Sequence, residues 1–352
     1  MRKEAVSFTW LVIGEGRRAD SASAEDRFVY AERKTQNARL CSERGIALMM
    51  VLWVLVLLSI LSMNFLASTR WSSASVRNFK EETQSYYLAL SGYQEALNYL
   101  ATDKDLAVDF LDSEDNFWID SETQPVTGKR TTEEGEVEIR ITDENSKINI
   151  NTANQDRLMK LFSYAGVKQE DLTDIVDSIL DWKDPDKEHH LSGAEDEYYE
   201  ALPEPYKTKN GVFTVPGELA LVKGMKPEYL SGTEEGGRAV LPLITTFGTN
   251  SININTVSKE VMETLGLNEV EIETILKQRN KDFGGFRFIP GDFTGRGLNT
   301  VATQNFRIEV IAKMHNSPIA SRLIGVVSRQ VSAKGLDFRT IYWSERAETI
   351  RS

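Results

Sequence analysis

The sequence has few of the residues that cross-link a chain or ligate soft metal ions. Its 352 residues include one cysteine, Cys41, and three histidines. One thiol excludes an intramolecular disulfide and a cysteine-rich zinc site, and three imidazoles limit histidine-based catalysis. Any stapling of the fold beyond packing must therefore come from an oxygen-ligated metal ion.

Positive charge is also in deficit, with 41 Lys and Arg against 53 Asp and Glu and a net charge of -12. Such a chain repels a phosphate backbone unless a local patch reverses the sign, so nucleic acid is not an expected partner. No Gly-x-Ser-x-Gly, His-Glu-x-x-His or P-loop motif is present, and we expect no enzyme. With 41% apolar and 27% charged residues, the chain can bury a core and has the length of about two domains.

The longest apolar run extends from Ile46 to Leu66 and contains 21 residues without a charge. As a helix it is roughly 30 Å long, the thickness of one hydrocarbon core, and it predicts a single membrane span. The run follows a cationic cluster formed by Arg33, Lys34, Arg39 and Arg44. By the positive-inside rule, we expect the N-terminus to stay in the cytoplasm and the chain after residue 66 to cross the membrane.

The junction before this run places a charge, Arg44, and a glycine, Gly45, directly against the apolar residues. A secretory signal peptide is cleaved after its apolar run, so the junction resembles a type IV prepilin signal instead. The resemblance implies that a prepilin peptidase cuts after Gly45, removing residues 1–45 as a cytoplasmic leader and making Ile46 the N-terminus. Pilins usually have Glu at the fifth mature position, where this chain has Met50, but one pilin-like family lacks that Glu. An uncleaved signal anchor is the alternative.

After the apolar run, the helical pattern continues. Large apolar residues recur at spacings of 4, 3, 4 and 3 in a polar background, at Tyr86, Leu90, Tyr93, Leu97 and Leu100. The spacing predicts that one helix continues from the membrane into a globular head. A polar, acidic loop is expected over residues 101–132. Alternating apolar and polar residues then predict strands at 136–142, 306–312, 323–327 and 338–343, which form a small antiparallel sheet.

An internal repeat separates the first of these strands from the others. Ile148-Asn-Ile-Asn-Thr152 recurs as Ile252-Asn-Ile-Asn-Thr256, an offset of 104, whereas Pro216-Gly-Glu-Leu219 recurs as Pro290-Gly-Asp-Phe293, an offset of 74. The first repeat, 147–224, therefore carries about 30 residues that the second, 251–299, lacks.

Each repeat has the periodicity of two short helices, the first starting at a capping box of Thr152 and Gln155. The predicted fold is thus α+β. A pilin-like N-terminal helix packs on a sheet domain (67–146 and 300–352), and an all-helical module (147–299) is inserted into that domain.

The paired helices resemble helix-hairpin-helix modules, which hold DNA phosphates through a Gly-apolar-Gly hairpin. The hairpins here, Gly166-Val-Lys168 and Gly266-Leu-Asn268, lack the second glycine that permits close backbone approach. Each helix pair also carries a net charge of -1. We therefore expect a protein-packing module, and a DNA-binding, competence-type pseudopilin remains an alternative.

The extra residues of the first repeat begin in the densest acidic stretch of the chain. Residues 181–207 contain nine Asp or Glu and three Lys. Carboxylates this close repel one another unless a cation lies among them, and a hard divalent ion suits Asp at i, i+3 and i+5 followed by Gly and further acids. The sequence therefore predicts a calcium site, with candidate ligands Asp181, Asp184, Asp186, Glu195 and Asp196.

Three alternatives to this calcium site stay open. The stretch can be a solvated acidic loop. Zinc is disfavoured, because the adjacent His189 and His190 project in different directions and no third His or Cys lies near them in sequence. The third alternative is the metal centre of a membrane-anchored, metal-dependent hydrolase.

In combination, these features resemble the minor pseudopilin K family of the type II secretion system. The motifs that carry the resemblance are the prepilin junction without Glu at position five, Ser146-Lys-Ile-Asn-Ile-Asn-Thr152, Asp181-Trp-Lys-Asp-Pro-Asp186, Gly193-Ala-Glu195, Tyr198-Tyr199 and Glu218-Leu-Ala-Leu-Val222. The resemblance implies a non-enzymatic component of the inner membrane and periplasm. It also implies assembly with the minor pseudopilins I and J and the other pseudopilus subunits, a position at the pseudopilus tip, and structural calcium in the helical insertion.

Overall fold

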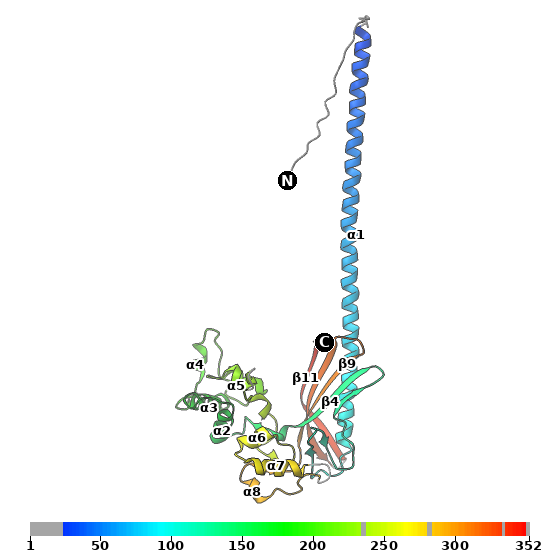
Figure 1. Ribbon diagram of the computed structural model, residues 1–352. Coiled ribbons are helices and arrows are strands. Elements are labelled where there is room, and N and C mark those ends of the chain that lie inside the picture. The colour runs from blue at the N-terminus through cyan, green and yellow to red at the C-terminus, as the bar shows by residue number, and fades with distance from the viewer. Residues whose placement is uncertain (1–23, 234–236, 280–283, 333–334, 350–352) are drawn as a thin grey trace, which may run out of the picture. The chain divides into compact units, whose positions relative to one another are not determined.

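The computed structural model describes residues 24–233, 237–279, 284–332 and 335–349. Residues 1–23 of the predicted leader lie outside this description. The chain divides into two compact units, residues 1–76 and 77–352, and Figure 1 follows the chain through them.

The first unit contains the N-terminal part of a single helix, α1 (Ala24–Ala101). From Ile46 onward this helix is long and apolar enough to cross a membrane, with a mean hydropathy of 2.7 in its most apolar window. Its large apolar side chains between Ile46 and Leu66 are all exposed. Such a continuous apolar surface is unfavourable in water and suits a hydrocarbon environment, as the sequence predicted. The bond between Gly45 and Ile46 lies within this helix.

The second unit is built on a five-stranded antiparallel sheet with the order β11-β10-β9-β4-β3. All four predicted strands are present, and all are longer than predicted, the last two by the most. Their bounds are Gly135–Asp143 for β4, Asn305–Met314 for β9, Ile319–Ser332 for β10 and Gly335–Thr349 for β11, and the unpredicted β3 spans Gly128–Thr131.

The C-terminal part of α1 shares a hydrophobic core with this sheet. Of the predicted apolar stripe, Tyr93 and Leu100 are buried, and the other three residues are partly buried. Gly92 brings helix and sheet together, because a Cβ at this position would lie 2.9 Å from Val137 Cγ1 and 3.0 Å from Val310 Cγ1. The absence of a side chain therefore sets the distance between α1 and strands β4 and β9.

The expected loop at 101–132 contains more structure than the sequence indicated. Besides β3, this segment contains two short strands of two residues each, β1 (Phe110–Leu111) and β2 (Phe117–Trp118), which pair with each other. The Phe110 and Trp118 rings stack with their centroids 6.0 Å apart. Strands of two residues are too short to show alternation, which is why the pattern missed them.

The inserted module contains both predicted helix pairs. They are α2 (Gln155–Tyr164) with α3 (Gln169–Lys183), and α6 (Lys259–Thr264) with α7 (Glu269–Gln278). Shorter helical elements are η1 (Glu144–Ser146), α4 (Asp196–Glu200), η2 (Pro216–Leu221), α5 (Pro227–Ser231), η3 (Leu241–Leu243) and α8 (Gly291–Thr294).

The module is not all-helical, because each repeat begins and ends on a short parallel bridge. β5 (Ile148–Asn149) pairs with β6 (Ile244–Thr245), and β7 (Ile252–Asn253) pairs with β8 (Leu298–Thr300). In the structure, repeat one therefore extends past residue 224 to its closing strand at Thr245.

The second asparagine of each Ile-Asn-Ile-Asn-Thr motif has the same role in both repeats. The Asn151 amide donates to the carbonyls of Phe213 and Thr246, and its oxygen accepts from the Phe213 N–H at 2.7 Å. Asn255 makes the matching three bonds to Phe286 and Val301. Each asparagine thus closes its repeat by satisfying backbone groups that lie far away in sequence.

The predicted capping box at Thr152 is wrong. The N-cap of α2 is Asn154, whose side chain accepts from the Arg157 N–H at 3.0 Å. Asparagine is at least as good an N-cap as threonine, and the helix consequently begins two residues later than the Thr152 pattern indicated.

The close approach at Gly92 makes a stability prediction. Gly92→Val should destabilise the protein by about 1–3 kcal/mol, because the added carbons overlap Val137 and Val310. Thermal unfolding of the full chain in detergent measures this loss. Gly217→Val is the matched control, since a Cβ at Gly217 meets nothing within 4 Å. Equal melting temperatures for the two variants would contradict the packing described here.

Candidate metal centre

The candidate centre lies where α3 ends. Asp181 is in the last turn of this helix and is fully buried, and Asp184 is the C-cap, with its N–H bonded to the Leu180 carbonyl. The buried face of α3, which includes Ile175 and Ile179, anchors the helix in the core of the module. Both aspartates therefore project from a rigid element.

An aromatic cluster attaches the acidic insertion to this helix end. The Trp182 ring meets the Tyr199 ring edge-on at 5.3 Å and the Tyr206 ring at 6.3 Å, and it stacks on Phe213 at 6.4 Å. Tyr199 belongs to α4 and is fully buried. Because Trp182 follows Asp181 directly, these contacts bring the far end of the insertion back to the two aspartates.

Four carboxylate oxygens in this region are buried without a hydrogen-bond partner in the described part of the chain. They are Asp181 Oδ2, Asp184 Oδ1 and both oxygens of Glu195. Burial raises the pKa of Asp184, and the nearby charges of Asp186 and Asp181 raise it further. Burial also raises the pKa of Glu195, again with a contribution from Asp181 and Asp184. These groups carry an electrostatic cost that a cation would remove.

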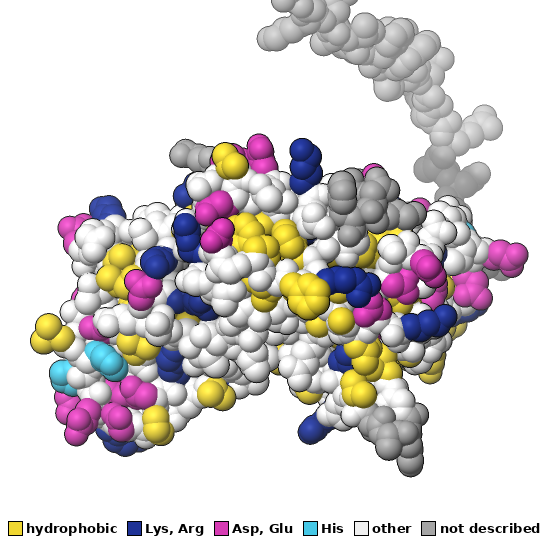
Figure 2. Space-filling view, turned by 90° about the horizontal axis from the view of Figure 1, so that it is seen from below, with side chains coloured by type: hydrophobic (Ala, Val, Ile, Leu, Met, Phe, Trp, Pro, Cys, Tyr) yellow, Lys and Arg dark blue, Asp and Glu magenta, His cyan; other side chains and the backbone are white. Residues whose placement is uncertain are grey.

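His190 joins the aspartates, although it was considered from the sequence only as part of a disfavoured zinc site and not as a calcium ligand. Its backbone N–H donates to Asp181 Oδ1 at 3.0 Å, and its ring Nδ1 makes a short contact with the same oxygen. This bond to Asp181 raises the pKa of His190. Ligand atoms of Asp181, Asp184 and His190 all lie within 4.8 Å of one another. In Figure 2, histidine and acidic side chains lie together at the lower left.

The other two candidate ligands have partners already. Asp186 is exposed, and its side chain accepts from the Glu188 N–H at 2.9 Å. Asp196 accepts from the N–H and the hydroxyl of Thr208 and forms an ion pair with Lys187 at 3.2 Å. Asp196 therefore holds the base of the insertion, and its role as a ligand stays a prediction.

Gly193 gives Asp181 the space that it occupies. A Cβ at this position would lie 1.8 Å from Asp181 Oδ2, one of the oxygens without a partner. The loop around it is fixed by Lys223, whose ammonium donates to the carbonyls of Ser192 and Gly193. Only glycine at 193 lets the loop close over the aspartate.

These residues fit an oxygen-ligated cation. Three carboxylates with partnerless oxygens resemble the ligand set that calcium takes, whereas a structural zinc site requires more nitrogen or sulfur than one imidazole. The chemistry that the arrangement supports is the binding of a hard cation between the end of α3 and the start of α4.

The helix pairs form the hairpins that the sequence predicted. Gly166 and Gly266 both have positive φ, 81° and 80°. A single glycine makes each turn, and the residues two positions later, Lys168 and Asn268, are the N-caps of α3 and α7. The hairpins thus start the second helix of each pair.

Known proteins share this sequence pattern. Residues 138–234, which begin within β4 and end just after α5, match the family model described as type II secretion system (T2SS), protein K. A protein named type II secretion system protein K from Pseudomonas aeruginosa is 24% identical over 285 residues, which cover 76% of this chain and 83% of that protein. One of the same name from Klebsiella pneumoniae is 26% identical over 234 residues, 62% of this chain and 68% of that protein.

The fold also has a solved counterpart. One chain of the GspK-GspI-GspJ complex from the type 2 secretion system of enterotoxigenic Escherichia coli superposes with a TM-score of 0.55 at 18% identity. The superposition covers 77% of this chain and 99% of that chain. The resemblance predicted from the sequence is confirmed: the chain is similar to type II secretion system protein K.

Proposed function

We propose that this protein is a minor pseudopilin of a type II secretion system, anchored by one span in the inner membrane with its N-terminus in the cytoplasm and its head in the periplasm. The observation that carries the proposal is the combination, in one chain, of an apolar N-terminal helix, a pilin-like sheet and a duplicated helical insertion whose first repeat lies within the match to protein K over residues 138–234. The role is structural and not enzymatic. The solved GspK-GspI-GspJ complex supports minor pseudopilins I and J as its partners.

The residue at position 50 supports a place at the tip of the pseudopilus. In pilin-like filaments, the carboxylate at mature position five neutralises the N-terminal ammonium of a neighbouring subunit inside the apolar bundle. An unpaired charge there costs several kcal/mol. Met50 offers no such carboxylate. The subunit is best accommodated where no subunit lies above it, and there its large head blocks further addition.

Calcium in the acidic insertion is the second part of the proposal. Its support is the set of four buried carboxylate oxygens without partners on Asp181, Asp184 and Glu195. The ion would neutralise these groups and tie α4 to the end of α3. In this role calcium is a structural clamp on the insertion.

The two other functions considered make different predictions. A DNA-binding pseudopilin would retain DNA in a salt-dependent manner, which the net charge of -12 disfavours. A metal-dependent hydrolase would show turnover that requires the metal ion.

The first prediction concerns processing. Co-expression with a prepilin peptidase should shorten the chain by the 45-residue leader, and Gly45→Val should block the cut. Mass spectrometry of the membrane fraction reads the new N-terminus, expected at Ile46. Gly14→Val, far upstream of the junction, is the control and should leave cleavage unchanged. If the wild-type chain is not cleaved in the presence of an active peptidase, residues 1–45 are not a prepilin leader.

The second prediction concerns assembly. The head, from about residue 70, should form a stable heterotrimer with minor pseudopilins I and J from the same organism. Size-exclusion chromatography with light scattering measures the mass of the complex. If the three proteins elute as monomers at micromolar concentration, the tip-complex proposal fails, and the anchoring and calcium proposals stand independently.

The third prediction concerns calcium. A ligand that binds only the folded state stabilises it by roughly 2.7 kcal/mol at a hundredfold excess over Kd. Calcium should therefore raise the melting temperature of chelated protein and protect residues 183–208 from proteolysis. Asp184→Ala with Asp186→Ala should remove most of this gain.

Two further variants sharpen the calcium test. Gly193→Ala should also weaken calcium binding, because its Cβ displaces Asp181 Oδ2. Asp156→Ala, an exposed carboxylate on α2, should respond to calcium as the wild type does. If millimolar calcium changes neither melting nor proteolysis, the insertion is a solvated acidic loop.

A further inference from the structure

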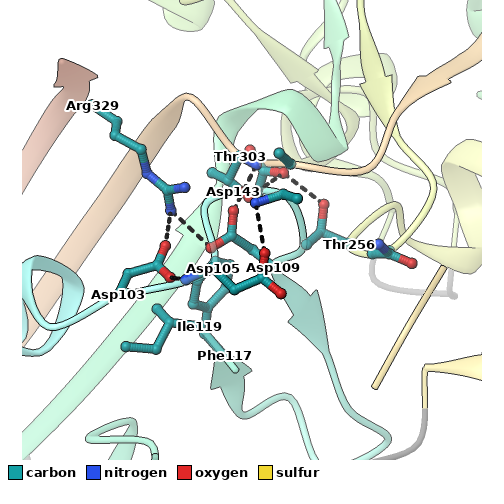
Figure 3. A network of polar contacts seen from close by, with 12 residues as sticks. Asp103, Asp105, Asp109, Phe117, Ile119, Asp143, Thr256, Thr303 and Arg329 are labelled. Carbon is teal, nitrogen blue, oxygen red and sulfur yellow. Dashed lines mark hydrogen bonds and ion pairs between the residues drawn. The ribbon is translucent and has the colours of Figure 1, made fainter. Parts of the chain in front are cut away.

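Three carboxylates and one guanidinium are buried together where the sheet, the segment after α1 and repeat two meet (Figure 3). The carboxylates are those of Asp103, Asp109 and Asp143, and the guanidinium is that of Arg329 on β10. None of these groups belongs to the candidate metal centre. With all of them ionised, negative charge exceeds positive charge in a region closed to water.

Arg329 compensates only part of this charge. Its Nη2 lies 2.7 Å from Asp109 Oδ1 and 3.2 Å from Asp103 Oδ2, so one cation serves two acids. Asp109 takes one more bond, from the Thr303 N–H at 2.8 Å, and Asp103 accepts from the Asp105 N–H at 2.9 Å. Burial raises the pKa of Asp109 to about 7, against the opposing effect of Arg329.

Asp143 pairs with no cation within the described ranges and is held by neutral donors alone. It is the last residue of β4, and its Oδ1 accepts from the Asn145 N–H at 2.7 Å. Three side chains converge on its Oδ2 at 2.7 to 2.9 Å, those of Thr256, Asn253 and Thr303. Two of these donors belong to repeat two. One carboxylate thus holds repeat two against the end of a central strand.

Thr303 connects the two acidic groups. Its N–H donates to Asp109 and its hydroxyl donates to Asp143. A hydroxyl both donates and accepts, so it can reverse its bond when Asp143 takes up a proton.

Among the described residues, two other acidic groups near this junction form ion pairs, and Asp120, whose charge acts on Asp103, accepts hydrogen bonds from Thr123. Glu144, beside Asp143 on η1, forms ion pairs with Arg307 of β9 and Lys147 and a short bond with Thr245. Asp105 pairs with Arg287 at 2.7 Å. The excess negative charge therefore resides on Asp103, Asp109 and Asp143.

We propose that Asp143 and Asp109, joined through Thr303, form a proton-controlled latch that sets how firmly repeat two is held on the sheet. Proton uptake removes buried negative charge that lacks a counter-ion, so mild acidification tightens the latch. Opening it at alkaline pH leaves the rest of repeat two folded, because its core does not include these groups.

The direction follows from proton linkage. Burial raises the pKa of Asp143 from 3.8 to about 6, in spite of its hydrogen bonds. A carboxyl group whose pKa is raised in the closed state binds its proton more tightly there than when open. The closed state therefore gains stability as the pH falls through 6 toward 4 and loses it as the pH rises again. The pKa of Asp109 is raised to about 7, so proton uptake by Asp109 also stabilises the closed state, beginning as the pH falls below about 7.

Hydrogen–deuterium exchange of the metal-free full chain in detergent tests the latch. The N–H of Leu111 reports opening, because it donates across the junction to the Asn255 carbonyl of repeat two. After correction for the intrinsic exchange rate, protection of a peptide covering residues 109–113 should rise at least about tenfold from pH 8 to pH 5, the factor expected from Asp143 alone. A peptide from α2 should show no comparable change.

Variants assign this effect to the named carboxyl groups. Asp143→Asn keeps the shape of the side chain but cannot ionise. In this variant the ratio of protection at pH 5 to protection at pH 8 should be about tenfold smaller than in the wild type. If that variant does not fold, Asp109→Asn is the second test and should also reduce the dependence. Asp156→Asn, on an exposed part of α2, should behave as the wild type does. Equal corrected protection at both pH values in the wild type, or a full wild-type response in both junction variants, overturns the proposal.

Discussion

The pairing of β4 with β9 is the constraint on which the rest of the head depends. These strands are neighbours in the sheet, and the whole helical module lies between them in sequence. Asp143 at the end of β4 pairs with Phe306 near the start of β9, so the module must begin and end about 5 Å apart. The two repeats meet this requirement, because each starts and ends on its own parallel bridge and brings its termini together. The cost of closing so long a loop grows only slowly with its length.

The fold was predictable where a pattern extends over enough residues to be unambiguous. The stripe on α1 and the alternation in β4 each repeat several times, and the five-residue motif Ile-Asn-Ile-Asn-Thr occurs twice. Each of these patterns appears in the structure as predicted. The bridges β5 to β8 were missed because two or three residues cannot show a period. The asparagines of the motif were visible, but their partners, such as Phe213 and Phe286, are brought to them only by the tertiary fold.

The candidate metal centre was predictable in part for the same reason. Asp181 and Asp184 lie one turn apart at the end of a helix, and local spacing is enough to bring them together. Glu195 was a candidate ligand from the sequence, and His190 was not. Both reach the aspartates through a loop whose path is set by Trp182, Tyr199 and Lys223, and spacing carries no information about that path. The glycine at 193 was a readable signal, since it lies between the two in sequence and permits the contact with Asp181.

The separation of β4 from β9 also affects how the protein folds. Contacts between residues distant in sequence form late, so the sheet is completed only after the module and β9 have been synthesised. Until then β4 has Val137, Ile139 and Ile141 on one face and no strand beside it on the β9 side. An apolar strand with a free edge is a site of aggregation, and alternating charged residues such as Glu136, Glu138 and Arg140 reduce that risk. The rate at which the two repeats fold therefore sets how long the nascent head stays vulnerable to misassembly.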